Sequence, residues 1–503
     1  MGTVFIGMDI GTTGVRAAIF TAEGKGRGYR YQEYPLMSDT AGKAELDPET
    51  IWESFLDVMK EAARQCKING DRIEGIGISS QMHSMVAVDR HGNPLTNIIT
   101  WADNRPAQET GRIAEQFNCG AFYQKTGCRI HHPAYYPAKI LWLKRAEPDI
   151  AAKVFKYLTI KEYILYKLYD EFVIDMTDAS ATACYNLKTF RWDNEILRDV
   201  IGIQESQLGN VVDCTHVMTG MKKEIASQIG IDPSVPMVIG SGDGIMANLG
   251  CGGIDSTTMS CTIGTSGALR IAVDKPLLDE QMRTWCYCFT KNKWVAGGAV
   301  NDGGIALKWF RDQLKGPYEQ DFDAYHVKNV YQLFDAYVQE IEIGSDGLFF
   351  LPFLTGERSP GWHPNASASV YGLKYAHDKR HFIRSAMEGV LYNMYSIFEV
   401  LSGIDSHVER IIANGGYVNS KVWLQMQADI FNREIFISQN SEAAAWGAAF
   451  TAMVAVGAAD GFESIKQETD DRCRIIPDEA NHQTYRKLYR KFRELYGTLI
   501  DVQ

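Results

Sequence analysis

Two short turns rich in glycine and hydroxyl residues stand out, one near the start of the chain and one past its midpoint. The first, Asp9-Ile10-Gly11-Thr12-Thr13-Gly14, follows the apolar run Val4–Met8, and the second is Gly264-Thr265-Ser266-Gly267. Glycine lets backbone N–H groups approach an anion closely, and threonine and serine hydroxyls add donors on the same side. Each turn alone is equally well explained as an ordinary hairpin turn. Their recurrence in both halves of the chain predicts two phosphate-binding loops.

Two aspartates at the ends of apolar runs are candidates for phosphoryl-transfer chemistry. Asp9 ends the first run and is suited to hold Mg²⁺, which usually takes one or two carboxylates plus phosphate oxygens. Asp243 follows the apolar segment Met237–Gly240 and lies between glycines that leave room for a substrate, as a general base requires. The alternative for Asp243 is a turn residue without a chemical role.

The elements that must position these residues alternate between strands and helices. Apolar residues at helical spacing over Ile51–Cys66, after Asp47-Pro48-Glu49, predict a helix. The segment Ile73–Ser79 is typical of a buried strand, and Arg16–Phe20 completes a hairpin after the first turn. Such alternation predicts an α/β architecture.

Length and charge limit the number of domains and the class of function. The 503 residues exceed the roughly 250–300 at which a single core stops growing, so we expect two domains, 1–250 and 251–503. The boundary falls where small residues cluster, at Gly250–Ser256. A formal net charge of −11 argues against broad binding to nucleic acid or to an anionic membrane. A small anionic ligand needs only a local positive pocket and remains compatible with this charge.

Several features predict a cytoplasmic protein. Met1 leads into the first strand without the basic segment, apolar core and cleavage site of a signal peptide. The ten cysteines are scattered without Cys-x-x-Cys pairs, as expected for reduced thiols. The run Ala443–Ala459 is apolar but dominated by alanine and glycine, which favours a buried, closely packed helix over a membrane span.

Six motifs occur in the order found in one family of enzymes. They are Asp9–Gly14, Gln81-Met82-His83, Trp101-Ala102-Asp103-Asn104-Arg105, Gly242-Asp243-Gly244, Gly264-Thr265-Ser266-Gly267 and Asn414-Gly415-Gly416-Tyr417. With Ser385-Ala386-Met387-Glu388 and its preceding residues, they make nearly the whole chain resemble the FGGY family of carbohydrate kinases. The resemblance implies two α/β domains of the actin and ribonuclease H type. It also implies a nucleotide cleft between them that binds ATP, with the sugar mostly against the first domain.

The resemblance assigns a role to each matching position. Asp243 is expected to be the catalytic base that accepts the proton of the attacking sugar hydroxyl, and Asp9 and Asp243 are expected to lie near Mg²⁺. The residues expected to bind ATP are Asp9, Thr12, Thr13, Gly14, Arg16, Gly264, Thr265, Gly304, Lys308, Gly415, Gly416 and Ser420. The alternatives are a solvated strand position for Arg16 and a helix cap for the two adjacent glycines.

The residues expected to bind the sugar come mainly from the first half of the chain. They are Gln81, Met82, His83, Trp101, Asp103, Arg105, Tyr135 and Asp243. Trp101 would form an apolar wall for the carbon face of the sugar. Two alternatives stay open: a structural role for His83, and a structural ion pair between Asp103 and Arg105.

The motifs indicate the substrate class less directly than they indicate the reaction. Stretches such as Gln81–Ser84, Ile99–Arg105 and Gly297–Gly304 resemble family members that phosphorylate D-gluconate to 6-phospho-D-gluconate. The segment Lys125–Pro137 matches them only in part, with Tyr135 where a small residue or methionine is usual. We therefore expect a sugar acid, with a ketose such as xylulose or a polyol as the alternative. A third possibility is an actin-like protein that hydrolyses ATP without modifying a sugar.

A sugar acid also sets a physical requirement on its site. Its carboxylate needs a positive or multiply donating partner, for which His83, Arg105, Arg129 and His131 are candidates. The small-molecule substrate and ATP are the expected ligands, and a homodimer is the default expectation for such an enzyme.

Overall fold

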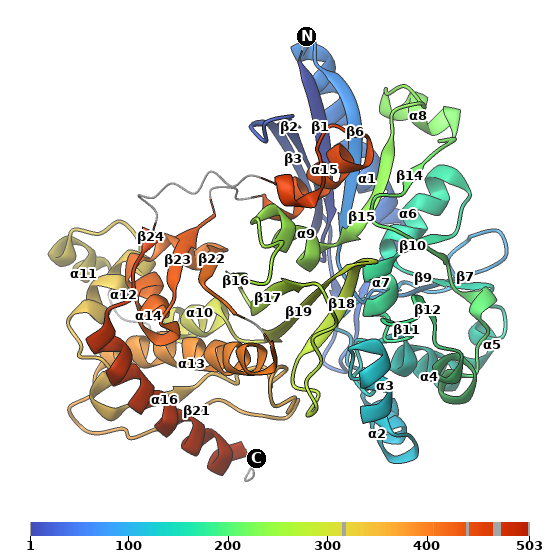
Figure 1. Cartoon of the computed structure of the whole chain (residues 1–503). Coiled ribbons are helices and arrows are strands. Elements are labelled where there is room, and N and C mark those ends of the chain that lie inside the picture. Colours follow the sequence, from blue (N-terminus) through green and yellow to red (C-terminus); the bar gives the residue numbers. More distant parts are fainter. Residues whose placement is uncertain (1, 314–317, 406, 439–441, 466–473, 501–503) are drawn as a thin grey trace. The chain divides into compact units, whose positions relative to one another are not determined.

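The computed structural model describes residues 2–313, 318–405, 407–438, 442–465 and 474–500 (Figure 1). The chain divides into two compact units, each made of segments that are separated in sequence. The first comprises Met1–Ile254, Val273–Val295 and Glu442–Lys466, and the second comprises Asp255–Ala272, Ala296–Ser441 and Gln467–Gln503. The predicted domain boundary near residue 250 stays a prediction.

A six-stranded sheet forms the centre of the first unit. Its order is β14 (Val217–Met218), β15 (Met237–Gly242), β6 (Arg72–Ser80), β1 (Thr3–Ile10), β2 (Gly14–Thr21) and β3 (Gly26–Glu33). β1 runs antiparallel to β2 and parallel to β6, and β15 is also parallel to β6. The carboxyl ends of β15, β6 and β1 therefore meet at one edge of the sheet.

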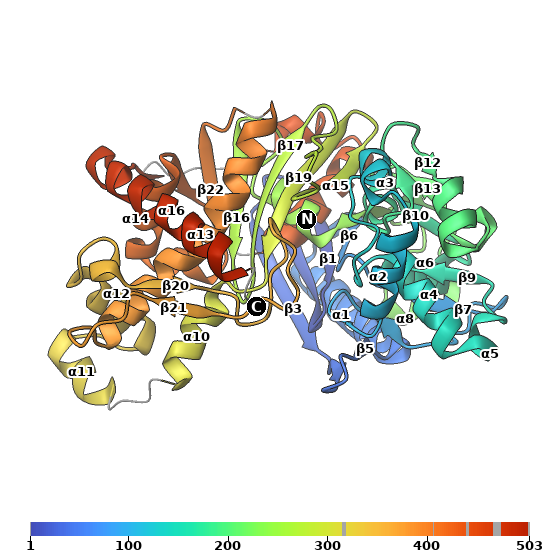
Figure 2. The same cartoon turned by 90° about the horizontal axis from the view of Figure 1, so that it is seen from below.

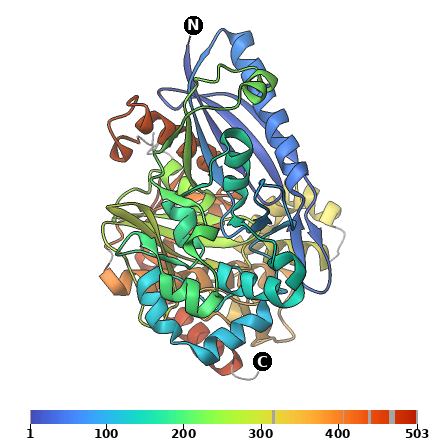
Figure 3. The same cartoon turned by 90° about the vertical axis from the view of Figure 1, so that its right-hand side faces the viewer.

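Helices cover both faces of this sheet. Successive side chains of each strand point to opposite faces, and both faces are apolar. Val4 and Ile6 of β1 belong to the same buried cluster as Phe55 of α1 (Pro48–Asn69), the long blue helix beside the blue strands in Figure 3. Gly7 points to the other face, where a Cβ would lie 1.7 Å from the carbonyl oxygen of Ala445. The second helix, α15 (Ala443–Ala455), therefore packs backbone to backbone on this face.

The predictions for these helices are confirmed. Asp47 caps α1 by accepting a hydrogen bond from the Thr50 N–H, and the helix begins at Pro48. The run of alanine and glycine that begins at Ala443 forms a buried helix, since small side chains permit the close approach. None of the helices in the described ranges combines the length and apolar character needed to cross a bilayer.

Smaller elements complete the first unit. They are β4 (Met37–Ser38), β5 (Ala44–Leu46), β7 (Val86–Val88), β8 (Ile98–Ile99), α2 (Ala107–Gln116), α3 (Cys119–Thr126), α4 (Tyr136–Ala146), α5 (Pro148–Ala151), β9 (Lys156–Leu158), α6 (Ile160–Tyr169), β10 (Val173–Asp175), α7 (Met176–Ala181), β11 (Tyr185–Asn186), β12 (Arg191–Trp192), β13 (Asn210–Val212), α8 (Lys223–Ile229), α9 (Asp243–Gly250) and β18 (Trp285–Thr290).

The second unit repeats the central strand arrangement of the first. Its strands follow the order β19 (Lys293–Val300), β17 (Gly267–Val273), β16 (Thr258–Ile263), β22 (Arg410–Asn414), β23 (Glu434–Ile437) and β24 (Arg474–Ile475). β16 is antiparallel to β17 and parallel to β22, as β1 is to β2 and β6, and β23 is parallel to β22. Each phosphate-binding loop predicted from the sequence thus joins the two strands of a hairpin at the same place in its sheet.

Helices make up most of the rest of the second unit. They are α10 (Gly304–Gln313), α11 (Tyr318–Tyr325), α12 (Val330–Gln339), α13 (Lys379–Asp405), α14 (Lys421–Phe431) and α16 (Glu479–Ile500), with a short hairpin of β20 (Phe349–Leu351) and β21 (Ser369–Tyr371). Figure 2 shows α12, α13, α14 and α16 gathered together, and α13 packs against α12, α14 and α16.

Candidate active site

The first turn is held by hydrogen bonds to its backbone. The Gly11 N–H donates to the Gly14 carbonyl oxygen at 2.9 Å and closes the turn. The Gly11 carbonyl oxygen accepts from the Tyr34 hydroxyl at 2.5 Å and from Gln81 Nε2 at 3.3 Å. A residue of the predicted sugar site therefore also fixes the predicted phosphate loop.

Asp9 and Arg16 face each other across this hairpin. Asp9 pairs with Arg16 in the strand register, and Arg16 Nε lies 3.4 Å from Asp9 Oδ2. Ser79 Oγ donates to Asp9 Oδ1 at 2.9 Å, and Arg16 Nη1 lies 3.2 Å from Glu442 Oε2. Burial raises the pKa of Asp9, while Arg16 and Ser79 oppose that shift. The Arg16 guanidinium is paired with two carboxylates and its side chain is partly exposed, so its role as a phosphate ligand stays a prediction.

Asp243 reaches the same edge of the sheet from β15. It is the first residue of α9, and its Oδ1 accepts from the Gly244 N–H at 2.6 Å. In the register, Gly242 pairs with Ser80 of β6, and Asp9 pairs with Ser79. The fold therefore collects Asp9 and Asp243 at the carboxyl ends of strands on either side of β6. Ligands of open α/β sheets bind at such ends.

The segment after β6 connects the two predicted sites. Thr12 Oγ1 donates to Gln81 Oε1 at 3.2 Å and accepts from Trp101 Nε1 at 3.0 Å. Met82 is buried against Gly242, where a Cβ would lie 2.5 Å from Met82 Cγ. Thr13 is exposed, and Trp101 is 38% exposed.

His83 has a backbone conformation that is unusual for its residue type, with φ of 65°. Its Nε2 lies 3.0 Å from the hydroxyl of Tyr287, which in turn lies 3.2 Å from the hydroxyl of Tyr135. Tyr135 is buried, and the centres of its ring and of the His83 ring lie 5.3 Å apart in a T-shaped arrangement. Sequence reasoning missed Tyr287, which is separated from His83 by 204 positions.

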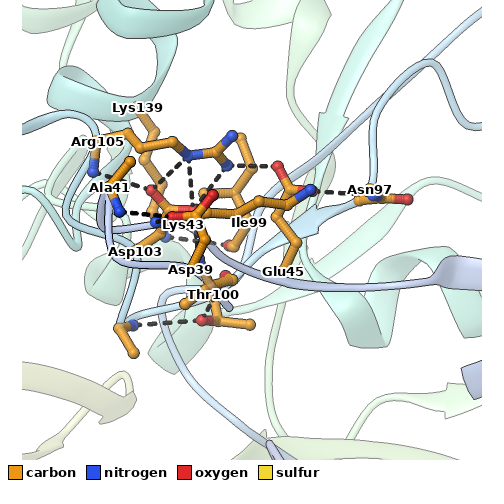
Figure 4. Close-up of polar contacts among 12 residues, drawn as sticks. Asp39, Ala41, Lys43, Glu45, Asn97, Ile99, Thr100, Asp103, Arg105 and Lys139 are labelled. Atoms are coloured by element: carbon orange, nitrogen blue, oxygen red, sulfur yellow. Dashed lines mark hydrogen bonds and ion pairs between the residues drawn. The ribbon is translucent and has the colours of Figure 1, made fainter. Parts of the chain in front are cut away.

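Asp103 and Arg105 form the ion pair that the sequence left as an alternative, as Figure 4 shows. Arg105 Nη2 lies 2.7 Å from Asp103 Oδ2, and it also contacts Glu45. The fully buried Asp103 accepts from the Ala44 N–H at 2.9 Å, and the guanidinium lies 4.3 Å from the centre of the Trp142 ring. The charges of the pair are thus matched within the protein. Their role as sugar ligands stays a prediction.

Two fully buried lysines near these residues were also missed. Lys139, visible in Figure 4, donates through Nζ to the carbonyl oxygen of His83 and, at 3.2 Å, to that of Ile99. Lys161 Nζ lies 2.6 Å from Asp175 Oδ2 and 3.0 Å from Asp178 Oδ2. In the sequence, both lysines stand in helical stretches that also carry other charged residues, so nothing local marked them as buried.

Another pair of candidates for the substrate carboxylate lies beside Tyr135. Arg129 Nη2 is 3.2 Å from His131 Nε2. Burial, with the Arg129 charge, lowers the pKa of His131 to about 4, so this imidazole is neutral near pH 7. His131 therefore brings no positive charge to a substrate.

In the second unit, the predicted loop folds onto the start of α10. The Gly304 N–H donates to the Gly264 carbonyl oxygen at 2.7 Å, and the Ile305 N–H donates to that of Thr265 at 3.2 Å. Gly415 follows β22 with φ of 96°, and a Cβ there would lie 2.6 Å from the carbonyl oxygen of Ile263. These glycines and Thr265 therefore meet at the carboxyl ends of two parallel strands.

Three other predicted nucleotide residues belong to the same unit. Lys308 is exposed on α10, and a Cβ on Gly416 would meet only open space. Ser420 caps α14 by accepting from the Trp423 N–H at 3.0 Å, and it donates to Asp335 Oδ1 at 2.6 Å. Gly415 is the N-cap of the short 3₁₀ helix Gly416–Asn419, as the alternative offered for these glycines expects, and its nucleotide role stays a prediction.

The two carboxylates at the edge of the first sheet fit a magnesium ion whose other ligands come from phosphate and water. Within the described ranges there is no group of three or more His, Cys, Asp or Glu side chains that could hold a metal ion. Asp9 and Asp243 supply two carboxylates, and Mg²⁺ usually takes one or two together with phosphate oxygens and water. The donor set thus fits Mg²⁺ that arrives with a nucleotide.

The fold and the site define a carbohydrate kinase. Residues 4–250 match the N-terminal domain of the FGGY family of carbohydrate kinases, and residues 259–456 match its C-terminal domain. The chain belongs to this family, which confirms the predicted fold of the actin and ribonuclease H type and the predicted enzyme class.

Relatives named for different substrates resemble the chain over nearly its whole length. A gluconokinase of Bacillus subtilis is 40% identical over 496 residues, which cover 98% of this chain and 96% of that protein. A xylulose kinase of the same organism is 27% identical over 98% of this chain and 96% of its own length. The solved structure of a gluconate kinase from Lactobacillus acidophilus has a TM-score of 0.92 at 32% identity, with 99% of each chain covered. That of a ligand-bound xylulose kinase from the same organism also has a TM-score of 0.92, at 33% identity, with 99% and 98% covered.

Proposed function

We propose that the protein transfers the γ-phosphoryl group of ATP to the terminal hydroxyl of a sugar acid, D-gluconate first, to give 6-phospho-D-gluconate and ADP. The main support for this reaction is that Asp243 lies at the same edge of the sheet as Asp9 and the Gln81–His83 segment. The 40% identity to gluconokinases supports the choice of gluconate.

Asp243 is the proposed catalytic base. Its carboxylate accepts the proton of the sugar hydroxyl as that oxygen forms a bond to the γ-phosphorus, and the bond between the γ-phosphorus and the β–γ bridging oxygen breaks to release ADP. The hydrogen bond from the Gly244 N–H fixes one carboxylate oxygen, so the base is oriented before the sugar arrives.

The first loop is proposed to bind the transferred phosphate. Thr12 and Thr13 supply hydroxyls, Gly14 lets the backbone turn back at the start of β2, and Arg16 supplies positive charge. Asp9, with Asp243, would hold Mg²⁺. When bound, Mg²⁺ neutralises phosphate charge. The second carboxylate partner of Arg16, Glu442, keeps its guanidinium in place when Asp9 is engaged elsewhere.

The second unit is proposed to bind the rest of the nucleotide. Gly264, Thr265 and Gly304 meet at the loop before α10, where backbone groups can approach phosphates closely. Gly415 and Gly416 have no side chain to obstruct a flat adenine ring. The remaining proposed nucleotide residues are Lys308 and Ser420.

The sugar side combines hydroxyl recognition with an apolar wall. Gln81 and His83 offer polar groups, and Met82 and the partly exposed Trp101 ring offer apolar surface. Tyr135 takes part through its contact with the His83 ring. Asp103 and Arg105 are retained as proposed sugar residues, although their contacts within the protein also explain them fully.

A ketose or polyol kinase is the second candidate. Two observations favour it: the tyrosine at position 135, and the equally high structural similarity to a xylulose kinase. The two candidates share the base, the loops and ATP, so they differ only in the sugar.

A substrate panel coupled to ADP production tests both. Gluconate, xylulose, ribulose, erythritol and glycerol are each supplied with ATP and Mg²⁺. We expect the highest kcat/KM with gluconate, and a loss of about 10²–10⁴-fold in Asp243→Asn, because a general base contributes that much. The control Asp57→Asn changes an exposed aspartate of α1 and should keep full activity. Highest activity with xylulose would select the second candidate, and ADP formation independent of any sugar would contradict both.

Two properties remain proposals alongside this activity. We propose a cytoplasmic location, in keeping with nine described cysteines that are all buried free thiols. A homodimer is the expected assembly.

A further inference from the structure

The helix α16 carries a concentration of positive charge that the proposed function does not use. Five of the eight residues from Arg486 to Arg493 are arginine or lysine, in a chain whose formal net charge is −11. Arg486, Arg490 and Arg493 follow one another at intervals of four and three residues, which places them on one face of the helix. The helix is anchored to the second unit by its buried residues, which include Tyr485, Tyr489, Phe492 and Leu495.

These three arginines line a groove between α16 and α13. Both helices belong to the second unit, and Figure 2 shows them side by side. Besides the arginines, the groove is lined by Tyr489 and Glu494 of α16 and by Tyr395 and Glu399 of α13. Its volume is about 560 Å³, which lies within the range of about 300–1,000 Å³ that is usual for small-molecule sites.

The two walls of the groove are tied to each other. The Tyr489 hydroxyl of α16 donates to Glu399 Oε2 of α13 at 2.9 Å, and it lies 3.1 Å from Ser396 Oγ of the same helix. The rings of Tyr395 and Tyr489 meet nearly at right angles, with their centres 4.7 Å apart. The groove therefore forms without a ligand, and aromatic surface lies between its charged groups.

The carboxylates of the groove have partners, whereas two of its arginines lack them. Glu399 accepts from Tyr489, and Glu494 Oε2 lies 3.2 Å from Lys491 Nζ. Neither Arg486 nor Arg490 forms an ion pair with a carboxylate of the described residues. Like charges four residues apart on a helix repel each other, so an anion held between these two guanidinium groups would remove a destabilising contact.

We propose that this groove binds a small phosphorylated molecule, a sugar phosphate in preference to inorganic phosphate, through Arg486 and Arg490. The planar guanidinium group matches phosphate oxygens with two parallel hydrogen bonds. Hydroxyl groups of the same ligand can donate to Glu399 and Glu494, and its carbon face can pack on the tyrosine rings.

The same residues disfavour a long polyanion. Glu399 and Glu494 repel every further negative charge, and the chain as a whole is strongly acidic, so a nucleic acid or an anionic membrane gains little beyond the first contact. The inference goes beyond the proposed function, since none of the proposed catalytic, nucleotide or sugar residues lines the groove.

Isothermal titration calorimetry of the full chain tests this site with D-glucose 6-phosphate, inorganic phosphate and D-glucose as separate ligands. We expect a Kd below about 1 mM for glucose 6-phosphate, at least about tenfold weaker binding of inorganic phosphate, and no heat with glucose. The double variant Arg486→Gln with Arg490→Gln should weaken glucose 6-phosphate about 10²-fold, because two charge-assisted contacts are lost.

The matched control is Lys60→Gln with Lys487→Gln, which also removes two charges, from exposed positions outside the groove. It should keep the Kd within about twofold. Circular dichroism and the kcat of the kinase reaction should be unchanged in both double variants, which shows that any loss of binding is local.

Five results would overturn the proposal. One is that the native protein binds no glucose 6-phosphate. Equal losses in the two double variants would mean a general attraction by charge, and equal affinity for inorganic phosphate and glucose 6-phosphate would mean an adventitious ion only. Binding that the Arg486 and Arg490 substitutions leave unchanged would place the sugar phosphate at the active site. Tighter binding of a short RNA that these substitutions abolish would make the groove a nucleic-acid surface.

Discussion

Lys139 and Lys161 are both fully buried in the first unit, but their ammonium groups contact different kinds of oxygen. Lys161 lies between two carboxylates, with Nζ 2.6 Å from Asp175 and 3.0 Å from Asp178. Lys139 donates to two backbone carbonyl oxygens, those of His83 and Ile99. A carboxylate compensates for the loss of water around a cation, whereas a carbonyl dipole does so only in part.

The difference appears in the ionisation of the two side chains. Burial lowers the pKa of Lys139 to about 7, and the more distant Asp103 only partly opposes this. For Lys161 burial acts in the same direction, but Asp175 and Asp178 outweigh it and raise the pKa. Lys161 is thus a charged structural link, and Lys139 is a weakly charged donor beside the proposed sugar site.

The largest expected effect comes from Lys161→Met. It leaves the buried side chains of Asp175 and Asp178 without their cation, which costs about 3–5 kcal/mol of unfolding free energy. Urea denaturation measures this as a lower midpoint at an unchanged slope. The control Lys167→Met lies on the same helix, where the lysine is partly exposed and pairs with Glu49 at 3.2 Å. It should cost less than about 1 kcal/mol. Equal losses in the two variants would mean that burial does not distinguish these ion pairs.

The second prediction concerns pH and uses Lys139 alone. Below pH 7 both folded and unfolded chains hold this proton, and between about 7 and 10.5 only the unfolded chain does. The unfolded state binds more protons in this window, so the contribution of Lys139 to stability rises with pH. The unfolding free energy of the native protein minus that of Lys139→Met should rise by about 2 kcal/mol from pH 7 to pH 9. Lys161 gives no such slope, because its folded pKa lies above the window. A flat difference would show that Lys139 keeps its charge.

The third prediction is kinetic. Lys139→Met removes the donor that holds the His83 carbonyl oxygen, so the KM for the sugar should rise about tenfold, the value of one hydrogen bond. Lys144→Met is a matched control, since Lys144 of α4 also donates to two carbonyl oxygens, those of Ile201 and Gly202, at 2.8 and 2.7 Å. It should leave the KM for the sugar unchanged. A similar rise in both variants would assign the effect to α4 as a whole.

Local sequence patterns were sufficient for elements whose signals lie within a few residues. The turn after Asp9 breaks an apolar run and returns as a strand, and Asp47 followed by proline marks the start of α1. The order of motifs also gave the family and the fold. In these cases, the residues that specify the structure are close together in the chain.

The missed residues depend on distant contacts. Tyr287 reaches His83 only because β18 lies in the first unit, and the register of three strands decides which residues meet at the sheet edge. A lysine in a helical stretch looks the same whether it faces water or a carboxylate. The burial of Lys139 and Lys161 and their partners could therefore not be identified in the sequence. The roles of the predicted site residues stay predictions.

The smallest expected effect separates the two carboxylates around Lys161. Burial raises the pKa of Asp178 to about 8, so near pH 7 this carboxyl keeps a proton, and Asp175 Oδ2, at 2.6 Å, is the nearer partner of Lys161 Nζ. Asp178 Oδ2 accepts from Lys161 and, at 3.4 Å, from Ser80, whereas Oδ1 has no hydrogen-bond partner among the described residues.

The two asparagine variants should therefore differ. In Asp178→Asn an amide replaces a neutral acid of the same shape, so the unfolding free energy at pH 7 should change by less than about 1 kcal/mol. In Asp175→Asn the charge that compensates Lys161 is lost, and the cost should reach about 3 kcal/mol or more. Urea denaturation of both variants at pH 7 measures the difference. Equal costs would mean that the two carboxylates share the negative charge and that Lys161 has two charged partners. Lys139 has no charged partner within hydrogen-bond distance among the described residues.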